Sequence, residues 1–239
     1  MTNPAFQPTQ WTMVLRASGR DEAGRAALSD LCAAYYAPVV AFLRRDGRTD
    51  DAARELAHAF FAAVLGGGVG APRPERGRFR SYLLGALKHF LTNHRASSGA
   101  AKRGGGVEHV PLVAETDTHP GHPIPAAPDS DSDLVFDREW AFTLIARALA
   151  ALEAEHQDRS QHFAILKPWL TGGTDQPQVE AARQLGISEA AVKVAIHRLR
   201  VRFREIVRNE IDATVPDPAE AAGELRHLIR ILSAAGGRE

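Results

Sequence analysis

The segment Ile196–Glu205, IHRLRVRFRE, places an arginine at every second position from 198 to 204. Alternation of this kind, taken alone, favours a β-strand with one cationic face. A wider window shows apolar residues at intervals of four, three, four and three: Val192, Ile196, Leu199, Phe203 and Ile206. This spacing is the apolar stripe of a helix, and residues 188–214 contain neither glycine nor proline. We therefore predict one long helix whose arginines flank a buried seam.

A shorter helix is predicted just before it, in the stretch PQVEAARQLGISEAAVKVAIHRL at 177–199. Val179, Ala182 and Leu185 fall on its expected inner face. Gly186 suits the left-handed conformation that ends a helix, and the hydroxyl of Ser188 can cap the next one. This order is typical of a helix-turn-helix, whose second helix enters the DNA major groove.

Residues near the start of the second helix are the candidate readers of base edges: Ser188, Glu189, Lys193 and His197. Three arginines are better placed to contact phosphates: Arg198, Arg200 and Arg204. The alternative is an ordinary αα-hairpin with a solvated basic face. Seven basic residues between positions 183 and 208, against two acidic ones, argue for DNA binding.

Charge is unevenly distributed, although Lys plus Arg and Asp plus Glu both number 29. Residues 76–103 hold seven basic residues and no acidic one, whereas residues 115–139 hold seven acidic residues and a single arginine. Two basic modules are thus separated by an acidic connector. One hypothesis is that this connector folds back over a basic face of the free protein and lowers its affinity for DNA.

The remaining segments predict an all-α fold of two helical domains joined by a flexible linker. Helices are expected at about 22–45, where Pro38 should kink or split the helix, at 49 or 50 to 65, and at 79–97. Residues 104–133 are rich in Pro, Gly and Asp, which is typical of a linker. We expect domains at 1–103 and 134–214, and a C-terminal helical extension at 215–239 that begins with Asp217 as N-cap.

Several classes of protein do not fit this sequence. Cys32 is the only cysteine, and His119 and His122 lie in the linker without a third ligand, so no metal and no cofactor is expected. The chain contains no GxxxxGK[ST], HExxH or GxSxG motif, and we do not expect an enzyme. No apolar run is long enough to span a bilayer, so we expect a cytoplasmic protein without membrane insertion.

Four stretches together resemble the extracytoplasmic-function sigma factors of bacterial RNA polymerase: LCAAYYAPVVAFLRRDGRTDDAARELAHAFFAAVL (31–65), PERGRFRSYLLGALKHFLTNHRASSGAAKRGGG (74–106), SEAAVKVAIHRLRVRFREIVRNEI (188–211) and DPAE (217–220). The resemblance implies that the first domain is sigma region two, which binds polymerase core and opens the minus-ten element. The second domain would be region four, which reads the minus-thirty-five element. The implied partners are polymerase core and promoter DNA, with an anti-sigma factor or an activating kinase as a candidate regulator.

Promoter opening exposes single-stranded bases, which proteins bind with cationic grooves and aromatic or amide side chains. The first domain offers such groups around its basic segment: Arg78, Arg80, Tyr82, Lys88, Asn93, His94, Arg95, Lys102 and Arg103. Of the aromatic residues there, only Tyr82 is expected to be partly exposed.

The resemblance also implies three contacts to polymerase core: Glu55, His58 and Phe61. The family usually has a second carboxylate where this chain has Ala59. We therefore expect weak binding to core that a modification, a partner or the C-terminal helix strengthens. The alternative function is a helix-turn-helix regulator that never contacts the core; it accounts for the second domain and leaves the first unexplained.

Overall fold

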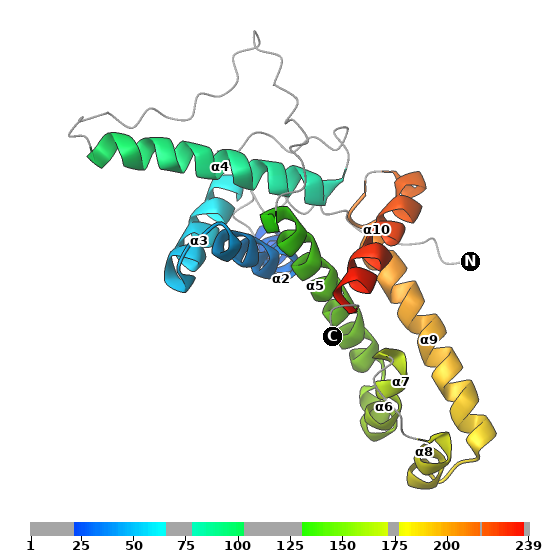
Figure 1. The fold of residues 1–239 in the computed structure, drawn as a ribbon. Coiled ribbons are helices and arrows are strands. Elements are labelled where there is room, and N and C mark those ends of the chain that lie inside the picture. The colour runs from blue at the N-terminus through cyan, green and yellow to red at the C-terminus, as the bar shows by residue number, and fades with distance from the viewer. Residues whose placement is uncertain (1–21, 66–77, 103–130, 172–176, 216, 237–239) are drawn as a thin grey trace. The chain divides into compact units, whose positions relative to one another are not determined.

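The computed structural model describes residues 22–65, 78–102, 131–171, 177–215 and 217–236. Every regular element in these ranges is a helix, which confirms the predicted all-α class (Figure 1). The elements are α2 Glu22–Arg45, α3 Asp50–Leu65, α4 Phe79–Lys102, α5 Asp131–Glu155, η2 Gln157–Arg159, α6 Ser160–Leu166, α7 Pro168–Thr171, α8 Gln178–Leu185, α9 Glu189–Asp212 and α10 Pro218–Gly236.

The described residues form two compact units. Unit 1 contains those up to Thr143 and those from Ala213 onward, and unit 2 contains Leu144–Asp212. The C-terminal helix α10 therefore belongs to the same unit as α2, α3, α4 and the first half of α5. The predicted domains at 1–103 and 134–214, with a separate extension at 215–239, stay a prediction.

The predicted linker needs one correction, because its last residues, 131–133, form the first turn of α5. Asp131 and Asp133 lie there, and carboxylates at a helix N-terminus interact favourably with the helix dipole. Residues 104–130 of the predicted linker lie outside the described part of the chain. The first turn of α5 thus places these two aspartates in unit 1.

Unit 1 has a core between α2, α3 and α4. Leu31, Tyr35 and Phe60 are fully buried in it, and the Tyr35 ring meets the Phe79 ring edge-on at 5.2 Å. Helix α2 continues through Pro38, so the expected split is wrong. The loss of one backbone donor at Pro38 is tolerated in a helix whose surrounding residues Val39 and Val40 are buried.

Helix α10 begins as the sequence predicts. The Asp217 carboxylate accepts a hydrogen bond from the backbone N–H of Ala219 at 2.8 Å, and Pro218 is the first helical residue. Just before it, the backbone N–H of Phe79 donates to the carbonyl oxygen of Thr214 at 3.1 Å. This bond ties the chain entering α10 to the start of α4.

Unit 2 buries the second half of α5 among the helices that follow it. Leu144, Ala148 and Leu152 of α5 are buried, together with Phe163 and Leu166 of α6. An ion pair between Arg147 and Glu210, at 3.1 Å, links α5 to α9. These contacts fix α9 on the rest of the unit through its buried stripe.

Candidate nucleic-acid interface

Helices α8 and α9 form the predicted helix-turn-helix at one end of unit 2. Gly186 adopts the left-handed conformation, with φ of 66°, and its N–H donates to the carbonyl oxygens of Ala182 and Arg183. The Ser188 hydroxyl accepts a hydrogen bond from the N–H of Ala191 at 3.2 Å, which caps α9. The turn and the cap are thus confirmed in detail.

One residue of the inner face was predicted wrongly. Val179 is 52% exposed, whereas Ala181 and Ala182 are the buried residues of α8. The inner face is therefore the row that contains Ala181, Ala182 and Leu185, rotated from the expected one. Two alanines at the crossing allow the close approach of α8 and α9.

The candidate base readers lie together on an open face. Ser188, Glu189, Lys193 and His197 are all exposed, and the last three follow at intervals of four, so they share one side of α9. Glu189 and Lys193 form an ion pair of 2.9 Å on this surface. Exposed pairs of this kind contribute little to stability, so both side chains can exchange partners at low cost.

The arginines of α9 fall into two groups. Arg198 and Arg204 are exposed, as a phosphate contact requires. Arg200 is exposed as a residue, but its guanidinium donates two hydrogen bonds to the carbonyl oxygen of Trp169, at 2.8 and 3.2 Å. Arg200 therefore holds α7 against α9, a structural role that the sequence did not reveal.

Arg202 has a similar structural role within unit 2. It donates two hydrogen bonds to Glu155, at 2.6 and 2.8 Å, and one to Glu205 at 2.9 Å. The hydrogen bond to Glu155 is the main reason why the pKa of Arg202 lies above its usual value, and the same bond lowers the pKa of Glu155. Two arginines of the alternating run thus bind within the protein.

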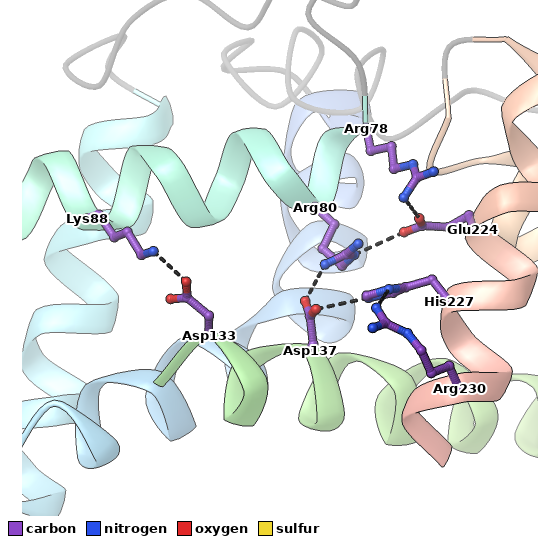
Figure 2. Close-up of polar contacts among 8 residues, drawn as sticks. All are labelled: Arg78, Arg80, Lys88, Asp133, Asp137, Glu224, His227 and Arg230. Carbon is purple, nitrogen blue, oxygen red and sulfur yellow. Dashed lines mark hydrogen bonds and ion pairs between the residues drawn. The ribbon is translucent and has the colours of Figure 1, made fainter. Parts of the chain in front are cut away.

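Figure 2 shows that the start of α4 is occupied by carboxylates of unit 1. Arg78 forms an ion pair with Glu224 at 3.0 Å, and Arg80 binds both Glu224, at 3.0 Å, and Asp137. Arg80 is 6% exposed, and its guanidinium lies 5.1 Å from the centre of the Trp140 ring. The prediction of an accessible cationic side chain is therefore wrong for Arg80, because three groups enclose it.

Burial and the two carboxylates act in opposite directions on Arg80. Burial lowers the pKa of Arg80, but the adjacent charges of Asp137 and Glu224 outweigh it and raise the pKa above its usual value. For Asp137, burial raises the pKa, while the hydrogen bond from His227 and the charge of Arg80 lower it overall. Both groups are charged near neutral pH, so the cluster is a true ion-pair network.

Further along α4 the predicted residues become more accessible. Lys88 is half-buried and pairs with Asp133 at 2.6 Å, and the exposed Arg95 pairs with Asp46. Asn93 is half-buried and His94 is exposed, with its ring 6.0 Å from that of Phe90. Lys102 is the last residue of α4, and the structure does not describe its side chain. Arg103, His119 and His122 lie outside the described residues.

Tyr82 and Phe90 are both half-buried, so the expectation of partial exposure holds for Tyr82, and its restriction to Tyr82 is wrong. Burial raises the pKa of the Tyr82 hydroxyl to about 12. Phe79 is fully buried, and Phe90 contacts Phe60 edge-on at 5.6 Å. Tyr82 is thus partly accessible as a residue, although its hydroxyl is largely removed from water.

The three predicted core contacts on α3 are not equally accessible. Glu55 and His58 are exposed, and the His58 ring stacks on Tyr36 with a hydrogen bond of 3.1 Å between Nε2 and the Tyr36 hydroxyl. Phe61 is 4% exposed, so its prediction as a surface contact is wrong. Its ring packs against Phe60 and Tyr36 inside unit 1.

The sequence-based prediction missed Glu224 and His227 of α10 and the role of Asp137. One signal was present: Glu224 lies four residues before Leu228, on the stripe that should be apolar. A carboxylate at a buried position needs a cationic partner. The sequence does not say which of the many arginines supplies it.

No protein-family model, no curated protein and no solved structure matches the chain. None of the helices in the described ranges combines the length and the apolar character that crossing a bilayer requires.

Proposed function

We propose that this chain is a sigma factor of the extracytoplasmic-function class, which acts in the cytoplasm and is not an enzyme. It would bind bacterial RNA polymerase core and direct initiation at specific promoters. The observation that carries the proposal is the presence of two cationic helices in separate units, α4 in unit 1 and α9 in unit 2. Each type of promoter contact then has its own helix, and α9 follows a capped helix-turn-helix.

In unit 2, the start of α9 would enter the major groove of the minus-thirty-five element. The exposed row of Glu189, Lys193 and His197 supports this role, since these side chains project from the first turns of the helix. Arg198 and Arg204 would contact phosphates on either side. Arg200 could contribute its positive charge while it stays bound to Trp169.

In unit 1, α4 would hold the single strand of the opened minus-ten element. Tyr82, Asn93, His94 and Arg95 are the candidate contacts whose side chains are at least partly accessible. A cationic helix with an amide and aromatic rings fits a strand whose bases are unpaired. Arg78, Arg80, Lys88 and Arg95 would bind the strand only after each leaves its carboxylate partner.

The polymerase core would bind the exposed face of α3. Glu55 and His58 lie there, and Ala59 is exposed one turn after Glu55. A single carboxylate in place of two predicts a weak contact. An anti-sigma factor or an activating kinase is the kind of partner that could regulate such a contact.

A regulator that never binds the core is the second candidate. The burial of Phe61 favours it, because one of the three predicted core contacts is removed from the surface. Gel filtration with purified core polymerase separates the two functions: a sigma factor co-elutes with core, and a plain regulator does not. Glu55→Gln is the matched variant, which should reduce co-elution, and Glu139→Gln on α5 is the control with the same charge change.

A further inference from the structure

The first turn of α4 holds a carboxylate that comes from the C-terminal helix. Each oxygen of Glu224 binds one arginine: Oε2 lies 3.0 Å from Nη1 of Arg78, and Oε1 lies 3.0 Å from Nε of Arg80. Glu224 is 0% exposed (Figure 2). A buried carboxylate between two guanidinium groups shows that this place accommodates an oxyanion.

Further along α10, His227 is hydrogen-bonded to Asp137 of α5 and to Arg230 of α10. His227 Nε2 donates to Asp137 Oδ2 at 2.9 Å, and Arg230 Nη2 donates to His227 Nδ1 at 2.8 Å. Glu224 is therefore the group through which α10 places a negative charge on α4.

Helix α10 is held by few apolar contacts. Among its residues whose side chains are described, only Glu224 and Leu228 are buried, and Ile229 is 54% exposed. A buried ion pair contributes little net stability, because desolvation of its charges offsets their attraction. The helix can therefore leave its place at a cost that a competing ligand is able to offset.

We propose that α10 is an autoinhibitory segment, in which Glu224 occupies an anion site beside Arg78 and Arg80. When α10 leaves, Arg80 keeps its ion pair with Asp137 of α5, and Arg78 is released to bind a phosphate of single-stranded DNA. Guanidinium groups bind the oxygens of both carboxylates and phosphates, so the Glu224 carboxylate stands in for the phosphate. The proposal rests on the proposed role of α4 in binding the opened strand. Thr214, bonded to Phe79, keeps the base of α10 attached while the helix beyond Asp217 moves.

Other basic residues predicted for the minus-ten contact are also paired with carboxylates. Lys88 binds Asp133 and Arg95 binds Asp46, but these carboxylates come from α5 and from the turn after α2. Glu224 differs because it lies on α10, where only Glu224 and Leu228 are buried among the described side chains. It is therefore the carboxylate that can withdraw as a unit.

The test compares two full-length variants with equal charge changes on α10. Glu224→Gln weakens the contact to both arginines, whereas Glu220→Gln alters a half-exposed carboxylate one turn earlier. Each is titrated, without polymerase, against a fluorescein-labelled single-stranded DNA of mixed sequence, and anisotropy gives the Kd. Because the apparent Kd is inversely proportional to the fraction of protein that is competent to bind, we expect about a tenfold tighter Kd for Glu224→Gln. We expect less than about a twofold change for Glu220→Gln.

Hydrogen exchange of the same samples shows whether the helix has left. Faster exchange in 218–236 with unchanged exchange in α2 and α3 is the expected result for Glu224→Gln. If that variant does not fold, His227→Gln, which loosens α10 from Asp137, should give a smaller change of the same sign in both measurements. The proposal is overturned if exchange in 218–236 becomes faster while the Kd for DNA stays unchanged. It is also overturned if no variant binds DNA more tightly than Glu220→Gln does.

Gel filtration with core polymerase distinguishes a failure of the autoinhibition proposal from a failure of the proposed sigma-factor function. Tighter DNA binding by Glu224→Gln in a protein that does not co-elute with core supports the autoinhibition and removes the sigma-factor function. Co-elution with core without tighter DNA binding supports the sigma-factor function and removes the autoinhibition.

Discussion

The guanidinium of Arg200, on α9, donates two hydrogen bonds to the carbonyl oxygen of Trp169, on α7. Arg204, one turn further along the same helix, is exposed. Both arginines are predicted phosphate contacts, yet only Arg200 has this structural bond, so the two roles can be separated by experiment.

Arg200→Ala and Arg204→Ala should both weaken binding to all DNA sequences and reduce the salt dependence by about one unit of slope. Arg200→Ala should in addition lower the free energy of unfolding by about 1 kcal/mol, since it removes a bond from a charged donor at a partly solvated site. Salt titrations of DNA binding and urea denaturation check the two effects. Equal unfolding free energies for both variants would show that the bond to Trp169 is dispensable.

Neutralising the first turn of α5 should tighten DNA binding at low salt. Asp133 pairs with Lys88 at 2.6 Å and Asp131 with Arg45 at 2.5 Å, so the first turn of α5 forms ion pairs with basic residues of α4 and α2. Asp131→Asn with Asp133→Asn frees both cations. The effect should become smaller at high salt, because salt screens the exposed pair of Asp131 and Arg45 more than the buried carboxylate of Asp133. Glu153→Gln in unit 2, whose carboxylate binds Lys167, is the control; an equal gain in that variant points to net charge alone.

Ala59→Glu should strengthen binding to polymerase core. Ala59 is exposed one turn after Glu55. A glutamate there gives the chain two carboxylates on this face, as expected from its resemblance to the sigma factors. The gain is at most about 1.5 to 3 kcal/mol, the range for a hydrogen bond to a charged group. Ala33→Glu adds the same charge at an exposed position of α2 and should be neutral. Tight binding of the wild type, with no gain from Ala59→Glu, would show that core binding needs no help.

Unit 1 should lose stability in acid through Asp137. Burial raises the pKa of this carboxyl, but His227 and Arg80 outweigh it, so its folded pKa lies below the unfolded value of about 3.9. A depressed pKa contributes stability above the unfolded value, and this stability is lost as the pH falls through the folded pKa. Thermal denaturation from about pH 6 to pH 2 should therefore show a steeper loss for the wild type than for Asp137→Asn. Parallel curves would mean that Asp137 carries no such linkage.

Local patterns made the helix-turn-helix predictable. Gly186 and Ser188 act through their own backbone and the next turn, so spacing alone identified the left-handed turn and the cap. The pairing of Arg80 with Glu224 spans 144 residues and depends on tertiary packing, which no periodicity encodes. Phe61 was assigned from resemblance, and its burial follows from the rings of Phe60 and Tyr36 around it. The sequence thus predicted the fold class and the exposed row of residues on α9. It did not predict the contacts between charged groups or aromatic rings that are far apart in the sequence.

Runoff transcription with purified core polymerase on a genomic DNA library tests the central claim most directly. The wild-type protein should give discrete transcripts that share an upstream element. Lys193→Ala and His197→Ala should weaken use of those promoters by about 1 to 3 kcal/mol each, according to the bases that each side chain contacts. An absence of transcripts above those of core alone, from protein that is folded and binds DNA, would contradict the sigma-factor function.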